Sequence, residues 1–493
     1  MAGNGTEPHF GSPECAPSGV GLVWVPGVEP LLAPGAGLVD IVEIEPQMWW
    51  DYRAGDARPY AMREEAFAFL EQSGKTVIVH GVGGGAAGTV LPPPGLTGHF
   101  HEVCARLKPA WISEHLSFLH QRENGERYFA GMMLPPLQTP AGAETAVASI
   151  RQVSRGLPAP FALETQVNYL RSTCGTLSDG EFMARVAEGL DCGILLDLTN
   201  LWVNEKNGRQ PVQEYLEAIP LDRVIEVHLA GARLDEGVWL DAHNGTLQDE
   251  VLALAERVLP RLRKVRALTL EVVPYFVPRA GMDLLTQQLQ VLRGLWDGRH
   301  KVRHAESPLP PAVDASRPRP RADLIPLDAA ETITPAAWEK ALGLWTALER
   351  DTGPVIAKLR GDRGLATYRM IANSFRWGNL TDLMGLAMQF LLRLKGAAWV
   401  EDMLADYCRW CMPGQFPIQE TETFAAYMRA HPIDHPYWKN VLDFEEAKLI
   451  ALRSGLPREI PFEYEPNALL ESVARGEIPV GLAEGKFVVE VTP

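Results

Sequence analysis

Eight short apolar runs, separated by stretches of helical pattern, fill the first three hundred residues and restrict the fold more than any other feature. Most runs are rich in Leu or β-branched residues and lack strict alternation, which is typical of strands buried on both faces. Eight such strands with helical crossovers predict a closed (β/α)8 barrel, an α/β fold, in preference to an open doubly wound sheet. The runs are Gly19–Val25, Leu38–Glu45, Thr76–Val82, Ala110–Phe118, Phe161–Tyr169, Gly193–Val203, Arg223–Ala232 and Ala267–Val273.

A proline-rich stretch separates the first three hundred residues from a region with a different hydrophobic pattern. Residues 305–326 contain six prolines, which predicts an extended linker. Long helical patterns fill residues 335–455, and two short strands are expected at Phe462–Tyr464 and Phe487–Val491 around a helix at Ala468–Arg475. The predicted domains are a flexible N-terminus (1–18), a metal-binding barrel (19–300), a linker (301–330) and a mostly helical domain (331–493).

Charge and composition narrow the classes of partner. The net charge of −16 disfavours a nucleic-acid-binding surface. Neither a signal-peptide pattern nor an apolar run of membrane-spanning length occurs, so we expect a cytoplasmic protein with no membrane partner. Cys408 and Cys411 precede His431 and His435 in the order of a zinc finger, but the 19-residue gap and helical surroundings favour unrelated thiols.

Histidines and carboxylates stand near the ends of the last six apolar runs. The C-terminal ends of barrel strands meet at one mouth, where active sites lie. Each residue alone has an ordinary structural explanation, as a core histidine or a salt-bridged carboxylate, but their repeated placement favours a metal site. Imidazole and carboxylate without thiolate suit Zn, Fe or Mn, and the number of groups predicts two or three ions. The strand-end residues are His80, His115, Glu164, Asp197, His228 and Glu271, and Asp241 and His243 follow in the loop after the seventh run.

Several spaced motifs across about residues 19–295 resemble one known family. The sequence is similar to the DUF692 family, the multinuclear non-haem iron-dependent oxidative enzymes, including the methanobactin-type peptide-modifying enzymes. That family is similar to xylose-isomerase-like and endonuclease-IV-like TIM barrels, which agrees with the strand pattern. The motifs are His80-Gly81, SEHL at 113–116, Leu163-Glu164, LLDLTN at 195–200, HLAG at 228–231, and Asp241 with His243.

The resemblance implies an activity and a set of ligands. The activity is oxidative modification of a ribosomally made precursor peptide, at cysteine, with O2 as co-substrate and two or three irons in mixed Fe(II)/Fe(III) states. Asp241 is expected to handle protons in addition to binding metal. The implied iron ligands are His80, His115, Glu164, Asp197, His228, Asp241, His243 and Glu271.

The sequence departs from the family pattern at one place that bears on metal number. Where the family commonly has an Asn-His pair, this chain has Asn207-Gly208. The resemblance therefore predicts two firmly held irons and a weak or absent third, with Asn200 as the remaining ligand of the third.

Family members often work with a separate protein that recruits the peptide, and residues 331–493 are interpreted as that partner fused in cis. Two other classes of function stay open. One is a divalent-metal-dependent hydrolase or isomerase on the same barrel. The other is a binding protein that uses a degenerate barrel as its scaffold.

Overall fold

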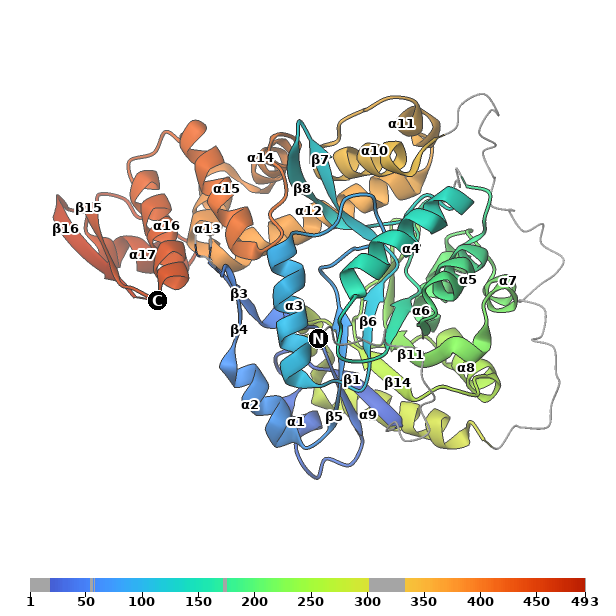
Figure 1. Ribbon diagram of the computed structural model, residues 1–493. Helices are drawn as coiled ribbons and strands as arrows, with labels where there is room; N and C mark the ends of the chain where they lie inside the picture. Colours follow the sequence, from blue (N-terminus) through green and yellow to red (C-terminus); the bar gives the residue numbers. More distant parts are fainter. Residues whose placement is uncertain (1–17, 54–55, 57, 172–174, 301–332, 493) are drawn as a thin grey trace, which may run out of the picture.

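The computed structural model describes residues 18–53, 56, 58–171, 175–300 and 333–492 (Figure 1). The expected linker at residues 301–330 lies outside these ranges, and so does the expected flexible N-terminus apart from residue 18. Both stay predictions.

Eight parallel strands close into one barrel in the order β1-β14-β11-β10-β9-β6-β5-β2. Each lies within one of the eight apolar runs, so the predicted (β/α)8 fold is confirmed. Every residue of five of these strands is buried, which explains why the runs do not alternate. The strands are β1 (Gly19–Val23), β2 (Ile41–Ile44), β5 (Thr76–Gly81), β6 (Ile112–His115), β9 (Phe161–Glu164), β10 (Gly193–Asp197), β11 (Val224–Ala230) and β14 (Ala267–Glu271).

The second half of the run Gly193–Val203 is a helix, and its prediction as strand was wrong. Strand β10 ends at Asp197, and α6 (Leu198–Lys206) begins at the next residue. The Asp197 side chain caps this helix by accepting a hydrogen bond from the Asn200 backbone N–H at 2.8 Å. The first seven residues of α6 are all buried, and a helix buried on every side has the same apolar pattern as a buried strand.

Helices cover the outside of the barrel (Figure 1). The start of α5 follows its sequence signal: the Ser178 side chain accepts from the Glu181 backbone N–H, and the Glu181 carboxylate accepts from that of Ser178. The helices of this half are α1 (Glu29–Leu32), α2 (Glu64–Ser73), α3 (Pro94–Leu107), α4 (Pro140–Ser154), α5 (Asp179–Leu190), α6, α7 (Val212–Ala218), α8 (Asp249–Val258) and α9 (Val277–Gly298).

Three antiparallel hairpins extend the loops of the barrel. In Figure 1 the hairpin of β7 and β8 lies beside the C-terminal helices, and α10 and α12 contact β8. The hairpins pair β3 (Trp50–Tyr52) with β4 (Tyr60–Met62), β7 (Phe118–Glu123) with β8 (Glu126–Leu134), and β12 (Ala232–Asp235) with β13 (Val238–Asp241).

The region after residue 332 is mostly helical, as predicted, and ends in a two-stranded sheet whose strands are longer than expected. Its elements are α10 (Pro335–Leu348), α11 (Pro354–Leu359), α12 (Arg363–Leu383), α13 (Gly385–Lys395), α14 (Ala397–Trp410), α15 (Pro417–Ala430), α16 (Trp438–Ser454), β15 (Arg458–Tyr464), α17 (Pro466–Ala474) and β16 (Glu484–Val491).

The buried apolar residues form two large clusters that do not divide at the proline-rich stretch. The first comprises the barrel core together with α10, α11 and the first half of α12, through residues such as Trp338, Ile356 and Tyr368. The Trp338 indole N–H also donates to the Pro135 carbonyl oxygen at 2.9 Å. The second cluster runs from the end of α12 to β16. The first C-terminal helices are therefore packed into the core of the barrel half.

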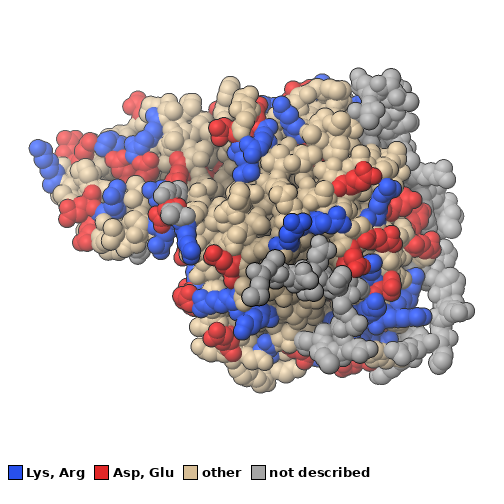
Figure 2. All heavy atoms as spheres, viewed as in Figure 1, with Lys and Arg blue, Asp and Glu red and all other residues tan. Residues whose placement is uncertain are grey.

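The surface carries both signs of charge, and on the face shown in Figure 2 acidic and basic side chains are mixed over both halves of the chain. Within the described ranges, no helix combines the length and the apolar character needed to cross a membrane.

Candidate metal centre

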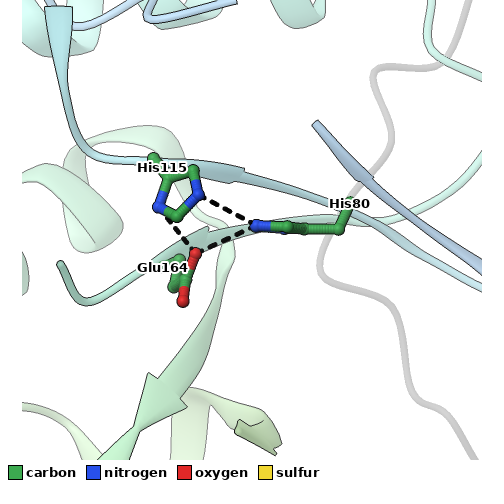
Figure 3. Close-up of side chains that lie close together, drawn as sticks. All are labelled: His80, His115 and Glu164. Carbon is green, nitrogen blue, oxygen red and sulfur yellow. Dashed lines mark hydrogen bonds and ion pairs between the residues drawn. The ribbon is translucent and has the colours of Figure 1, made fainter. Parts of the chain in front are cut away.

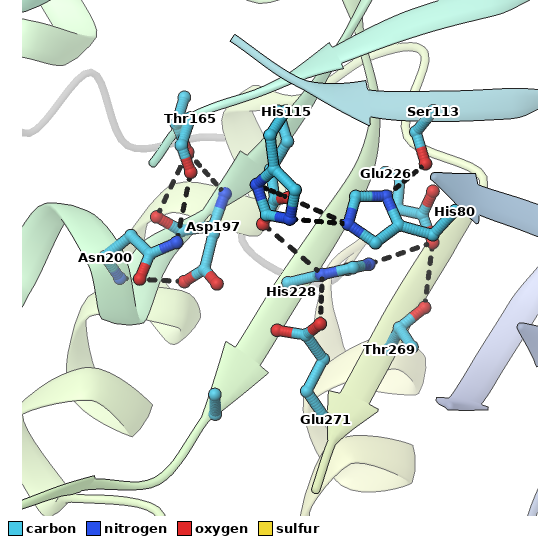
Figure 4. Close-up of polar contacts among 12 residues, drawn as sticks. His80, Ser113, His115, Thr165, Asp197, Asn200, Glu226, His228, Thr269 and Glu271 are labelled. Atoms are coloured by element: carbon cyan, nitrogen blue, oxygen red, sulfur yellow. Dashed lines mark hydrogen bonds and ion pairs between the residues drawn. The ribbon is translucent and has the colours of Figure 1, made fainter. Parts of the chain in front are cut away.

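Six strands of the barrel deliver one histidine or carboxylate each toward a common centre (Figure 4). These residues lie at or near the C-terminal ends of successive strands β5, β6, β9, β10, β11 and β14, whose parallel alignment brings the ends to one mouth. All of them are buried except His115, whose side chain is 12% exposed. The six are His80, His115, Glu164, Asp197, His228 and Glu271.

The first group of ligand atoms consists of His80, His115 and Glu164 (Figure 3). The His80 Nε2 lies 3.1 Å from the His115 Nε2 and 3.0 Å from Glu164 Oε2, and His115 Nδ1 lies 2.7 Å from the same oxygen. Metal bonds to imidazole and carboxylate are about 2.1 Å long, so neighbouring ligands of one ion stand roughly 3 Å apart. The three side chains already have this spacing.

A hydrogen bond to the ring nitrogen that faces away from the first group fixes the orientation of His80. Its Nδ1 lies 2.8 Å from the Ser113 hydroxyl, and that hydroxyl donates to the Val79 carbonyl oxygen. The hydroxyl therefore accepts from the Nδ1–H of His80, which leaves a lone pair on Nε2 facing the group.

The second group consists of Glu164, Asp197, His228 and Glu271, with one ligand atom of each within 4.8 Å of the others. The His228 Nδ1 is 3.3 Å from Glu271 Oε1 and 3.7 Å from Glu164 Oε1. Because Oε2 of Glu164 faces the first group and Oε1 faces the second, this carboxylate is placed to bridge two ions.

The other three candidate residues border the second group without belonging to either one. His243 Nε2 lies 2.7 Å from Asp241 Oδ2 and 3.7 Å from Glu271 Oε2. The backbone of His243 has a φ of +47°, a sparsely populated conformation for a residue with a side chain. Asn200 lies in the first turn of α6, where its backbone N–H donates to Asp197.

Glu43 and Glu226 are parts of this site that the sequence reasoning missed. Both are fully buried, and the His228 Nε2 lies 3.0 Å from Glu43 Oε2 and 3.4 Å from Glu226 Oε1. Trp111 and Thr269 donate to the two oxygens of Glu226. A signal was available: Glu226 stands two residues before His228 in a strand and so points to the same face, and Glu43 interrupts an apolar run.

Burial and neighbouring charges shift the pKa values of the carboxylates in this site. Burial acts to raise the pKa of Glu271, but His228 and His243 outweigh it and lower that pKa to about 2. Asp197 behaves oppositely: burial and the neighbouring carboxylates of Asp241, Glu271 and Glu164 raise its pKa well above the usual range. Crowded buried carboxylates of this kind favour a bound cation in place of protons.

Several polar atoms of the site are buried and have no hydrogen-bond partner among the described residues, which is expected where they serve as metal ligands. Four histidines and four carboxylates without a thiolate suit Fe, Zn or Mn, so the residues fit a multinuclear centre. The atoms are Asp197 Oδ2, Asn200 Oδ1, His228 Nδ1, Asp241 Oδ1 and Glu271 Oε2.

The chain is similar to curated proteins of bacteria that carry the name UPF0276 protein. It is 31% identical to one from Chromobacterium violaceum over 184 residues, which are 37% of this chain and 65% of that protein. With one from Caulobacter vibrioides it shares 28% identity over 266 residues, 52% of this chain and 87% of that protein. The chain thus spans less than two thirds of the first relative, and 52% of a Vibrio vulnificus relative that is 36% identical.

Among solved structures, D-psicose 3-epimerase from Clostridium cellulolyticum aligns with 58% of this chain and 99% of its own, with a TM-score of 0.37 and 12% identity. A xylose isomerase-like TIM barrel protein from Mycobacterium smegmatis aligns with 57% of this chain and 98% of its own, with a TM-score of 0.36 and 10% identity. Neither carries information about the chemistry of this chain.

One family model matches residues 19–276, which include all nine residues proposed for the site as well as Glu43 and Glu226. The chain therefore belongs to the family of RiPP precursor modification enzymes MbnB/TglH/ChrH, enzymes that act on ribosomally made precursor peptides.

Proposed function

We propose that this chain catalyses an iron- and O2-dependent oxidation of a ribosomally made precursor peptide, at cysteine, in the cytoplasm. The observation that carries the proposal is the pair of ligand groups that share Glu164, in a chain of this enzyme family. Two ions side by side would allow substrate and O2 to be held at neighbouring positions.

The first group would hold one iron through His80, His115 and Glu164, and the second would hold another through Glu164, Asp197, His228 and Glu271. Iron bound there supplies electron transfer and O2 activation, and it lowers the pKa of a substrate thiol. The chain's own residues orient these ligands and exclude water, since nearly all of the ligand side chains are buried.

Asp241 and His243 are proposed to complete the second group and to move a proton. Their side chains form a pair at 2.7 Å, and the other Asp241 oxygen has no hydrogen-bond partner among the described residues. Because Oδ2 of Asp241 is paired with the His243 imidazole and Oδ1 has no such partner among the described residues, Oδ1 is suited to accept a proton from a substrate at the mouth of the barrel.

Two irons are proposed in preference to three because Gly208 stands where the family commonly has a histidine. Gly208 has a φ of +80°, and a Cβ there would lie 3.3 Å from the Arg171 guanidinium. Asn207 beside it is fully engaged, because its side chain donates to the Trp239 carbonyl oxygen and accepts from the Trp239 N–H. A third iron would depend on Asn200 and is expected to bind weakly or not at all.

Residues 331–493 are proposed to recruit the peptide in place of a separate partner protein. The terminal sheet supports this role, because β15 and β16 pair only with each other among the described strands and so each retains an unpaired edge. An extended leader peptide can add to such an edge through backbone hydrogen bonds.

The test is the metal content of protein purified without oxygen, by elemental analysis and by Mössbauer spectroscopy on iron-enriched material. Two coupled irons per chain are expected. His80→Ala and His228→Ala should each lose iron and oxidation of a short cysteine-containing precursor encoded by a neighbouring gene. His101→Ala is the matched control, because His101 lies on α3 and its ring forms a hydrogen bond with the Val153 carbonyl oxygen, outside both ligand groups.

Full iron and activity in either site variant would contradict the assignment. Zinc or manganese without iron would favour the hydrolase or isomerase, and no metal at all would favour the scaffold protein.

A further inference from the structure

The C-terminal helical region contacts the loop that follows β9, close to the metal centre. Tyr368 of α12 is fully buried, and its hydroxyl accepts a hydrogen bond from the Tyr169 backbone N–H at 3.2 Å. The two rings pack edge to face with centroids 5.4 Å apart. The helix lies so close to the loop that a Cβ on Gly364 would be 2.0 Å from the Tyr169 carbonyl oxygen. Only glycine at this position permits the contact.

Tyr169 continues this contact to a proposed metal ligand. Its side-chain hydroxyl accepts from the Asp241 backbone N–H at 3.3 Å, and its ring is buried. Asp241 is the last residue of β13, a short strand paired only with β12 among the described elements. The hairpin therefore depends on neighbours outside it to hold the Asp241 carboxylate toward His243 and Glu271.

We propose that Tyr368 is a positioning residue for the metal centre: through Tyr169 it fixes the backbone of Asp241, so that the C-terminal region forms part of the wall of the second metal group. The inference rests on the proposed function, since it takes Asp241 as a ligand. It adds that the C-terminal region supports metal binding as well as peptide recruitment.

Removing the Tyr368 hydroxyl should weaken metal binding at the second ligand group only. Tyr368 and Tyr169 approach the centre from the side of Asp241, whereas His80 and His115 are supported by Ser113 and the strands β5 and β6. If the backbone of Asp241 is held less firmly, iron should bind more weakly at the second group and with unchanged affinity at the first. Loss of supporting hydrogen bonds of this kind lowers metal affinity by about 10- to 100-fold in other metal sites.

The experiment is an anaerobic titration of metal-free full-length protein with ferrous iron, followed by equilibrium dialysis and Mössbauer spectroscopy. Tyr368→Phe should bind one iron with unchanged affinity and the other about tenfold more weakly, with a changed spectrum for the weaker iron. Tyr407→Phe is the control. Tyr407 is equally buried in the C-terminal region, and its hydroxyl donates to Glu420 of that region, away from the loop that carries Tyr169.

A second variant keeps the test decisive if Tyr368→Phe fails to fold. Tyr169→Phe removes the hydroxyl at Asp241 directly and should weaken the same iron. Because both hydroxyls act along one path, the double variant should bind iron no more weakly than Tyr169→Phe alone.

Wild-type affinity and spectrum in Tyr368→Phe, additive effects in the double variant, or an equal loss in Tyr407→Phe would each overturn the inference while leaving the two-iron centre in place. A wild-type chain that binds no metal would overturn the proposed function and this inference together.

Discussion

The hydrogen bond between His228 and Glu43 offers a direct test of how the barrel interior orients a proposed metal ligand. The Nε2–H of His228 points to Glu43 at 3.0 Å, which leaves Nδ1 facing Glu164 and Glu271. Glu43→Leu removes this acceptor. The next acceptor, Glu226, is 3.4 Å away, beyond the usual range for N–H···O bonds.

The size of the effect follows from the charge state of Glu43. Burial is the main cause that raises the pKa of this carboxyl to about 8, so near pH 7 it is mostly neutral, and the variant removes chiefly a hydrogen bond. One net hydrogen bond is worth about 0.5 to 1.5 kcal/mol, which is about a two- to tenfold change in an equilibrium constant. We expect iron to bind the second group about two- to tenfold more weakly in Glu43→Leu.

Glu43→Gln is the matched control for this prediction. A glutamine imitates the protonated acid, because its carbonyl oxygen accepts from His228 and its amide N–H donates toward Glu226, whose ligand-type oxygen lies within 4.8 Å. The assay is the anaerobic ferrous iron titration at pH 7. The reasoning is refuted if Glu43→Leu binds iron like the wild type. It is also refuted if Glu43→Gln is as weak as Glu43→Leu, which would assign the effect to negative charge.

Three further predictions concern the contact between the two halves. Gly364→Ala should destabilise the fold or displace α12, because its Cβ meets the Tyr169 carbonyl, and thermal unfolding should show a lower Tm than that of Gly378→Ala, which has open space. Trp338→Ala should cost about 3 to 5 kcal/mol in urea unfolding, since this indole is buried in the barrel core; an effect below 1 kcal/mol would place α10 outside that core. Burial lowers the pKa of His120 to about 4. Between about pH 6.5 and pH 4, this imidazole therefore binds a proton in the unfolded chain but stays neutral in the folded chain. Stability should therefore fall from pH 7 to 5 by about 2 kcal/mol more in the wild type than in His120→Gln, and equal pH dependence in urea unfolding would contradict this.

The barrel was predictable because its signal is local in the sequence. A strand buried on both faces must be apolar along its length, and eight such runs in 280 or so residues leave few other folds. The second half of Gly193–Val203 was wrongly predicted as strand because the prediction relied on the same local apolar pattern. The helix α6 is buried on all sides at its start, so its composition does not distinguish it from the strand that it follows.

The site was predictable in part. Six strand ends carry a histidine or a carboxylate, and strand ends of a barrel must converge, so the meeting of His80, Glu164 and His228 followed from topology. Glu43 was not predictable as a partner of His228, because 185 residues separate them and only closure of the barrel brings β2 opposite β11 across its interior.

The barrel, the helical character of the C-terminal region and the types of side chain at the mouth could be read from the chain, because each depends on periodicity and residue chemistry. The folded arrangement was needed to show that Glu164 faces both ligand groups, that Glu43 and Glu226 contact the Nε2 of His228, and that Tyr368 contacts Tyr169, 199 residues away in the sequence. These are contacts between residues far apart in sequence. Their distances depend on how strands register and how helices dock, which no local pattern records.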